Sequence, residues 1–238
     1  MAASSTHRQR LPRATLSTRI SAQLRDDILR GVFPAGAQLN EAQIAGDFGV
    51  SRGPLREAMQ RLIQEGLLRS EPNRGVFVPA LSEEDLRDVF FVRTVLESAA
   101  LRRILSRGDR RRVSQDLTDI AGRMHQAVSA EKWHEGGELD FEFHRVLVDA
   151  AGSERLSRSY ATVQAETKMC LHELMGGYRN TRKLADEHFH LAKLIGDAGA
   201  DEILAALTAH LRDPTSAYRK ARAAAGETTS PGVQDRGP

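Results

Sequence analysis

The 238-residue chain is poor in three features that would each place it in a particular class of protein. It has one cysteine, Cys170, which excludes an intrachain disulfide framework and fits a reducing compartment. It has no apolar run near the roughly 18 residues of a membrane helix and no secretory signal, so we expect a cytoplasmic protein without a membrane partner. Aromatic residues make up 5% of the chain and apolar residues 40%, so we expect a core of Leu, Ile, Val and Ala, as in helical bundles.

Lysine is missing from the first third of the chain. Residues 1–79 hold 11 arginines, no lysine and 7 acidic residues, a net charge of +4, whereas residues 80–238 carry a net charge of −2. A basic front suggests that this part alone binds a polyanion. Ordinary charge scatter is the alternative, and an excess of four is modest. The charge therefore supports a nucleic-acid hypothesis only when a motif points the same way.

The most informative pattern lies at residues 41–78. It reads as a short helix, a tight turn, a second helix that opens with Arg52 and Arg56, and a small hairpin. That order predicts a winged helix-turn-helix, which places its second helix in the major groove of DNA. The two arginines share one helix face, where arginine can form paired hydrogen bonds to guanine or bind phosphate.

Local signals predict where the front helices begin and end. The apolar spacing predicts a first helix over residues 17–30, before a turn-rich connector. Asn40 is expected to cap the next helix. Ser51 is expected to cap the recognition helix by accepting the amide of Gly53, because Pro54 has no amide hydrogen.

A short hairpin follows the recognition helix. Its strands are predicted at residues 68–70 and 76–78. Arg74 and Gly75 lie at its tip, where they can approach the minor groove or the DNA backbone. A plain surface hairpin is an equally good interpretation of these residues taken alone.

The remainder of the chain shows only helical periodicity. It predicts an antiparallel bundle of six or so helices, broken at Gly108, Gly152, Gly176-Gly177 and Gly199. The expected fold class is therefore mostly α. We divide the chain into a disordered basic arm (1–15), the winged helix-turn-helix (16–79), a linker (80–82), an all-α domain (83–221) and a disordered tail (222–238).

Polar groups recur inside the apolar helices of the rear domain. Asp140 and His144 lie four residues apart on one helix face, His188 lies in a later amphipathic segment, and His210 lies in the last helix. An aspartate and three histidines facing inward can build a metal site with open positions, suited to Zn²⁺, Ni²⁺, Mn²⁺ or Fe²⁺. His190 competes with His188 for the third position. The alternative is that these histidines are ordinary hydrogen-bonded core residues.

Arg93 stands in an apolar stretch of the first bundle helix, where an unpaired charge is costly. It has two interpretations. It can pair with Glu97, four residues later, or it can point into the bundle and hold a carboxylate ligand.

These residues resemble a known family. The segments GVFPAGAQLNE, SRGPLREAMQRLIQEGLL and RGVFV are similar to those of the GntR family of bacterial transcription regulators. The rear resembles the FCD ligand-binding domain of the FadR subfamily through FFVRTVLE and through Asp140-x-x-x-His144 with the two later histidines. The resemblance covers about residues 15–213. It departs from the family at Gly53, where most members have Thr or Ser, and at Ala42, where some relatives use arginine.

The resemblance implies roles for individual residues. DNA contacts are implied for Ser51, Arg52, Gly53, Arg56 and Gly75, with Arg74 beside them in the wing. The metal-binding branch implies Asp140, His144, His188 and His210 as metal ligands, and Arg93 as the partner of a small organic acid effector. We therefore predict a homodimeric, ligand-responsive regulator, a repressor rather than an enzyme, which binds a palindromic double-stranded DNA operator. A metalloenzyme and a metal-free regulator of an apolar or acyl ligand are the alternatives.

Overall fold

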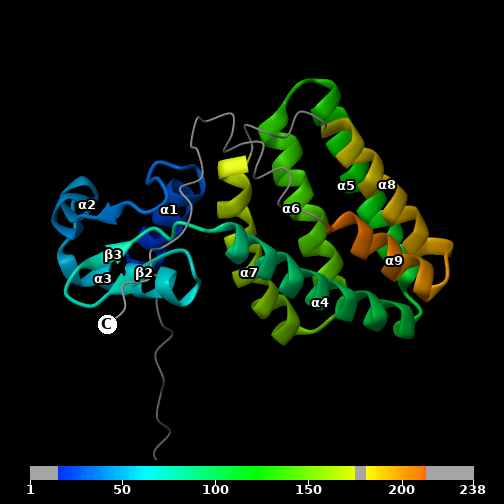
Figure 1. The fold of residues 1–238 in the computed structure, drawn as a ribbon, viewed down its shortest axis with the longest axis horizontal. Coiled ribbons are helices and arrows are strands. Elements are labelled where there is room, and N and C mark those ends of the chain that lie inside the picture. Colours follow the sequence, from blue (N-terminus) through cyan, green and yellow to red (C-terminus); the bar gives the residue numbers. More distant parts are fainter. Residues whose placement is uncertain (1–15, 175–180, 213–238) are drawn as a thin grey trace, which may run out of the picture. The chain divides into compact units, whose positions relative to one another are not determined.

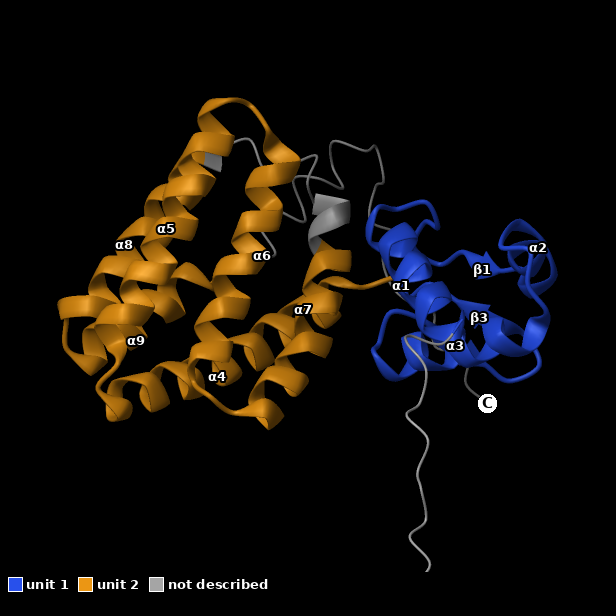
Figure 2. Ribbon diagram, turned by 180° about the vertical axis from the view of Figure 1, so that it is seen from behind, with its two compact units in different colours: residues 1–79 blue, residues 80–238 orange. Residues whose placement is uncertain are grey.

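The computed structural model describes residues 16–174 and 181–212. The predicted arm at 1–15, the predicted break at Gly176-Gly177 and the predicted tail at 222–238 lie outside the described residues. The chain divides into two compact units, with the boundary between Pro79 and Ala80 (Figure 2). Within the described residues the fold is mostly helical, with one small sheet, which confirms the predicted fold class.

The first unit is built around three helices. Ile20, Leu24 and Ile28 are buried and form the inner stripe of the first helix, which starts and ends one residue earlier than predicted. Leu55 and Leu62 of the third helix pack on the other side of this core and are fully buried. The elements are α1 (Leu16–Leu29), β1 (Gln38–Leu39), α2 (Glu41–Asp47), α3 (Arg52–Gln64), β2 (Arg69–Glu71) and β3 (Gly75–Phe77).

The hairpin belongs to a three-stranded antiparallel sheet in the order β1-β3-β2. Ser70 lies opposite Val76 within the predicted hairpin, and Gln38 of β1 lies opposite Phe77. The sequence analysis missed β1, because two residues are too few to show an alternating pattern. This extra strand joins the wing to the connector that precedes α2.

The two predicted helix caps have different outcomes. The side chain of Asn40 accepts hydrogen bonds from the amides of Ala42 and Gln43, at 3.0 and 3.2 Å, as expected of a cap. Ser51 occupies the cap position of α3, but its side chain makes no capping hydrogen bond. The predicted bond to Gly53 is therefore wrong, and the Ser51 side chain is exposed. With Pro54 at the third helical position, one of the two amides that a cap usually binds is missing.

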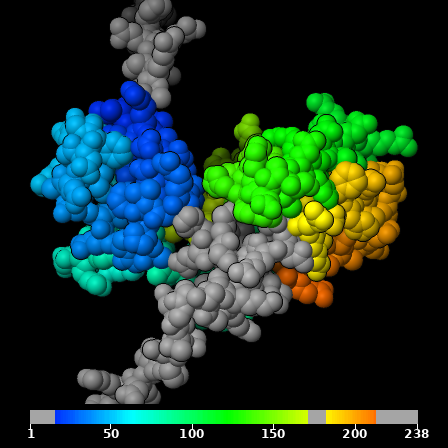
Figure 3. All heavy atoms as spheres, turned by 90° about the horizontal axis from the view of Figure 1, so that it is seen from above, coloured from blue at the N-terminus to red at the C-terminus, as the bar shows by residue number. Residues whose placement is uncertain are grey.

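The second unit is a helical bundle. Its main core is formed by buried aliphatic residues of α4, α5, α6, α8 and α9, with Phe143 among them. Figure 1 shows α5 and α8 side by side, with α9 between them and α4. In the space-filling view, the yellow atoms of α8 lie against green atoms of the bundle (Figure 3), and α8 packs mainly on α5. The helices are α4 (Glu83–Arg107), α5 (Arg110–Ser129), α6 (Trp133–Ala150), α7 (Glu154–Leu174), α8 (Thr181–Asp197) and α9 (Ala200–His210).

The glycine-based breaks account for most of the bundle's turns. Gly108 ends α4 in the left-handed conformation, with φ of 80°, which glycine adopts without steric cost. The turn between α5 and α6, at residues 130–132, was missed in the sequence analysis. There Glu131 adopts φ of 58°, a conformation that a non-glycine residue seldom takes, so the turn leaves no glycine signal. Across residues 16–174 and 181–212, no helix combines the length and the hydropathy that a membrane-spanning segment needs.

Candidate functional site

Three helices of the second unit bring the four predicted metal ligands together. Asp140 and His144 come from one face of α6, His188 from α8 and His210 from α9. One ligand atom from each of the four residues lies within 4.8 Å of the others. The sequence analysis proposed all four residues as one possible site, but spacing placed only Asp140 and His144 on a common face, and the fold brings the other two to them.

The ligand atoms converge on a small volume. The Nε2 atom of His144 lies 3.2 Å from Nε2 of His188 and 3.2 Å from Nε2 of His210. The Oδ1 atom of Asp140 lies 2.9 Å from Nε2 of His188 and 3.8 Å from Nε2 of His144. All four side chains are at most a tenth exposed. Three imidazole nitrogens and a carboxylate oxygen thus face one buried point.

The opposite nitrogen of each ring faces a hydrogen-bond acceptor. Nδ1 of His144 lies 2.7 Å from the carboxylate of Glu97, and Nδ1 of His188 lies 2.8 Å from the carbonyl oxygen of Leu184. Nδ1 of His210 lies 3.2 Å from the carboxylate of Glu187. These acceptors favour the tautomer with the proton on Nδ1, which leaves the Nε2 lone pairs directed at one another.

Burial sets the protonation states at this point. Burial, with the charge of Arg93, holds the pKa of His144 well below its usual value. Burial also lowers the pKa of His210, although its bond to Glu187 opposes the change. Burial alone would raise the pKa of Asp140, but its close contact with the ring of His188 and the positive charge of Arg93 lower it overall. At neutral pH the site therefore presents neutral His144 and His210 beside an ionised carboxylate.

This arrangement fits a divalent cation. Ring nitrogens that face one another 3.2 Å apart with their lone pairs directed inward repel, and a cation among them would convert that repulsion into coordination. Each ring is also oriented by a carboxylate or carbonyl on its far side, as metal-ligating histidines commonly are. The donor set suits zinc and other first-row metals and does not choose between them.

Arg93 makes the pair with Glu97 that the first of its two interpretations predicts, and it does so inside the bundle. Its Nε atom donates to Glu97 at 2.7 Å, and the side chain is buried in the bundle with 3% of its surface exposed. Tyr160 of α7 donates to the same carboxylate oxygen at 3.0 Å. Burial raises the pKa of Glu97, while Arg93 opposes the change. Glu97 therefore connects the guanidinium, the phenol and the ring of His144.

The remaining histidines on described side chains lie outside the cluster. His190, the competitor of His188, is exposed on α8. His125 pairs with Asp186 at 3.1 Å on the surface of α5 and α8, and His134 is exposed. The side chain of His172 is outside the description. His188 rather than His190 therefore completes the cluster.

The recognition helix displays its predicted residues to solvent. Ser51, Arg52 and Gly53 are exposed at the start of α3, a helix of 13 residues and about 20 Å. Arg56 is also exposed, and its Nε donates to Glu41 of α2 at 2.7 Å. No ion pair links Arg52 to any described residue. Of the two arginines, Arg52 thus has the side chain that is freer to contact a ligand.

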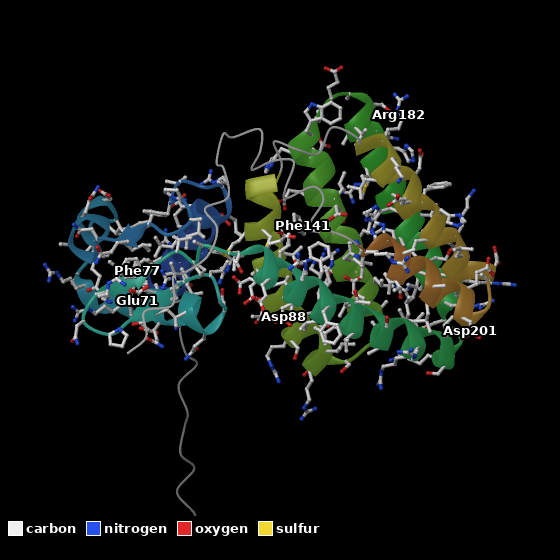
Figure 4. The ribbon with its side chains drawn as sticks, viewed as in Figure 1. Glu71, Phe77, Asp88, Phe141, Arg182 and Asp201 are labelled. Atoms are coloured by element: carbon white, nitrogen blue, oxygen red, sulfur yellow. The ribbon has the colours of Figure 1, made fainter. Side chains whose placement is uncertain are left out.

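Contacts with neighbouring residues of the sheet fix the tip of the wing, where Arg74 and Gly75 lie. Arg74 is exposed, pairs with Glu71 and lies over the ring of Phe77, with its Cζ 5.5 Å from the ring centre. Figure 4 shows Glu71 and Phe77 close together in this unit. Gln38 of β1 donates to the backbone carbonyl of Arg74. Gly75 has φ of 105°, so the turn needs glycine here.

Sequence reasoning missed three residues of the bundle site. Glu97 was assigned only to Arg93, whereas it also contacts His144. Tyr160 and Glu187 were not considered. Their contacts join helices far apart in the sequence, so no local spacing could reveal them. A buried tyrosine, which needs a partner for its hydroxyl, was the only available signal.

Comparison with known proteins decides the family. The model of bacterial regulatory proteins of the gntR family matches residues 16–78, and the FCD domain model matches residues 88–213, more than half of the chain. The chain belongs to the GntR family of bacterial transcription regulators. It is a DNA-binding regulator with an FCD domain, and the predicted assignment to transcription regulators rather than enzymes is confirmed by the family.

Several relatives of this GntR regulator are known. The Nta operon transcriptional regulator of Aminobacter aminovorans is 32% identical over 181 residues, which cover 76% of this chain and 83% of the relative. The gluconate operon transcriptional repressor of Bacillus licheniformis is 30% identical over 141 residues, 58% of this chain and 56% of the relative, so the match spans about half of that protein. A GntR transcriptional regulator of Rhodococcus sp. RHA1, with a solved structure, has a TM-score of 0.69 and 26% identity, over 87% of this chain and 98% of its own.

Proposed function

We propose that this regulator is a metal-dependent sensor of a small organic acid, which controls a palindromic operator as a homodimer. The observation that carries the proposal is the convergence of His144, His188 and His210 on Asp140 inside the FCD bundle. A bound divalent cation would supply a Lewis acid able to take an oxygen of a carboxylate effector. We place the protein in the cytoplasm, where its DNA target lies, and in the FadR subfamily.

The chain's own groups would select the effector by charge. Arg93 is a buried cation on α4, and the charges of Arg93 and Asp140 influence one another. A guanidinium beside open coordination positions suits an anion that carries a second carboxylate or hydroxyl group. One of the relatives controls a gluconate operon, and gluconate is a sugar acid of this class. That name supports the effector class without identifying the compound.

The front unit would carry out the regulatory step. Arg52 and Arg56, exposed on α3, would read or clamp each half-site, with Gly75 and Arg74 of the wing at the flanking backbone. Several relatives are repressors, which favours repression here. Effector binding would change the operator affinity by shifting the dimer between two states.

The test of the metal centre uses two histidines of the same helix. We expect His188→Ala, purified without affinity-tag metal, to lose the bound metal that elemental analysis finds in the unaltered protein. His190→Ala removes an exposed ring two residues away and should keep the metal. Equal metal content in the unaltered protein and both variants would contradict the proposed ligand set. Absence of metal from the unaltered protein, even after incubation with zinc, nickel, manganese or iron salts, would favour the metal-free alternative.

A further inference from the structure

The outward face of α4 carries a row of charged and apolar side chains that take no part in the candidate metal centre. Positions separated by four, three, four, three and four residues share one side of a helix. This side lies opposite the face that buries Arg93 and Glu97. We name it the α4 stripe, and its residues are Glu84, Asp88, Phe91, Val95, Ser98 and Arg102.

The centre of the α4 stripe is apolar and open to solvent. Phe91 is 67% exposed and Val95 is 51% exposed, one helical turn apart. No other two of the exposed large apolar side chains in the described ranges lie one turn apart on one helix. An exposed apolar pair with charged residues on either side is suited to contact with another molecule.

The ends of the α4 stripe carry opposite charges. Glu84 and Asp88 stand near the start of the helix and Arg102 near its end. No ion pair links any of these three to another described residue, whereas Arg87, on the flank of the stripe, pairs with Glu83. The helix dipole favours this order of charges on any helix. It does not explain why they flank an exposed apolar pair.

The α4 stripe is complementary to itself when reversed. Glu84 and Arg102 each lie nine residues from position 93, Asp88 and Ser98 each lie five, and Phe91 and Val95 each lie two. Two copies of α4 laid antiparallel about that position would place each acid of one copy opposite the arginine or serine of the other. The same operation would set phenylalanine against valine. A two-fold axis requires this self-complementary pattern.

We infer that the α4 stripe is the surface through which two copies of this chain associate, antiparallel about position 93. Beside Phe91 lies an open hollow of about 500 Å³, on the helix where Figure 4 labels Asp88. Its lining residues are Glu84, Asp85, Arg87, Asp88 and Phe91. This mostly acidic lining suits the guanidinium of Arg102 from the second copy. The inference rests on the proposed homodimer and names its contact surface.

Charge reversal tests the pairing directly. Arg102→Glu places two acids opposite each other at both ends of the interface, and Glu84→Arg places two arginines there. Each variant alone should dimerise more weakly, because like charges across an interface are strongly unfavourable. Sedimentation equilibrium should show a dimer dissociation constant raised at least about tenfold. An equimolar mixture of the two should form heterodimers, since every cross-pair is then opposite in charge. The double variant, E84R with R102E, should dimerise by itself.

The controls separate pairing from unfolding and from net charge. Arg111→Glu makes the same charge change at an exposed position of α5 and should leave the dimer intact. Circular dichroism melts should show that the single variants remain folded, because their side chains are exposed. Phe91→Ser should weaken the dimer without a partner charge to restore it.

The outcomes distinguish this surface from the wider proposal. A dimer in the unaltered protein that tolerates both charge reversals would overturn the α4 stripe and leave the homodimer proposal standing. Dissociation of both single variants without rescue in the mixture would also overturn the antiparallel pairing. A monomer at all concentrations, with the stripe covered by another part of the same chain, would overturn the dimer itself. The metal test at His188 is independent of all three.

Discussion

Glu97 connects groups that a bundle interior would otherwise have to leave unpaired. Its two carboxylate oxygens accept from Arg93, Tyr160 and His144, over distances of 2.7, 3.0 and 2.7 Å. Buried charge is tolerated only where it is paired and hydrogen-bonded on every side. One residue thus neutralises the guanidinium and orients a ring of the candidate metal site.

Glu97→Ala should therefore be severely destabilising. It leaves the guanidinium of Arg93 buried without its partner, a change that typically costs about 3–5 kcal/mol. Urea unfolding followed through the fluorescence of Trp133, the one tryptophan of the chain, would measure the effect on the bundle. Glu142→Ala is the matched control. It breaks an exposed pair with Arg123 and should cost about 1 kcal/mol or less. Similar losses in the two variants would contradict a central role for Glu97.

Arg52→Ala should weaken operator binding more than it weakens folding. Its side chain is exposed at the start of α3 and makes no ion pair with a described residue, so little stability is lost. A bidentate contact to guanine would make the loss of DNA affinity about 1–3 kcal/mol. A titration against a duplex selected from a random pool would measure it. Arg61→Ala, on the same helix but bonded to Thr18 and Glu57, should keep the affinity. Equal affinities for the unaltered protein and Arg52→Ala would refute the assignment.

At the scale of the element, α4 begins with a signal that is visible in the sequence. Ser82 accepts from the amide of Asp85 at 3.1 Å, and the carboxylate of Asp85 accepts from the amide of Ser82 at 2.8 Å. This reciprocal pair is a capping box, and it satisfies two amides that the first turn leaves free. The hydrogen bonds from the side chain and backbone of Ser82 hold the pKa of Asp85 below its usual value.

Ser82→Ala should destabilise the bundle in a pH-dependent manner. Loss of the cap should cost about 1 kcal/mol at neutral pH. The pKa of Asp85 is lower in the folded state than in the unfolded state. Its contribution to folding stability is therefore complete above the unfolded pKa near 3.8, and it is lost as the pH falls through the lower folded pKa. The difference in unfolding free energy between Ser82→Ala and the unaltered protein should therefore shrink below about pH 4. Urea titrations at several pH values would measure it, with Ser106→Ala as a control that removes an exposed hydroxyl on the same helix. A pH-independent difference would contradict the role of Asp85.

Local chemistry explains which elements could be predicted. Asn40, Gly108 and the apolar stripe of α1 each act through neighbours in sequence, so their effects could be read directly. The turn at Glu131 and the two-residue strand β1 have no such signal, because tertiary contacts rather than local preference select them. The cap at Ser51 was predicted from residue type, and the absent side-chain bond is decided by the geometry of one turn.

The candidate site was predictable only in part for a related reason. Asp140 and His144 share a helix face, so periodicity brings them together. His188 and His210 were proposed because each lies in an amphipathic segment, but they join the pair only because α8 and α9 pack in the same bundle, which helical spacing cannot show. The choice between His188 and His190 followed from burial, since two adjacent faces of one helix cannot both point inward.

At the scale of the whole molecule, sensing and DNA binding belong to different compact units. The front carries an excess of positive charge, and the rear carries the buried His/Asp cluster. An effector in the rear can alter DNA affinity only if it binds two states of the molecule with different strength. Regulation is therefore a coupling free energy between the two units rather than a property of either one.

That coupling must be reciprocal, and reciprocity is the sharpest prediction for the intact regulator. We expect an organic acid, found by thermal-shift screening of sugar acids, hydroxy acids and dicarboxylates with the metal-loaded protein, to change operator affinity by about 5- to 150-fold. Calorimetric titration of the same acid into the protein–operator complex should then show its own affinity changed by the same factor. His188→Ala should still bind the operator but lose the response, because the rear unit alone would hold the effector. An acid that binds the bundle tightly yet leaves both affinities unchanged would show that the cluster does not control DNA binding.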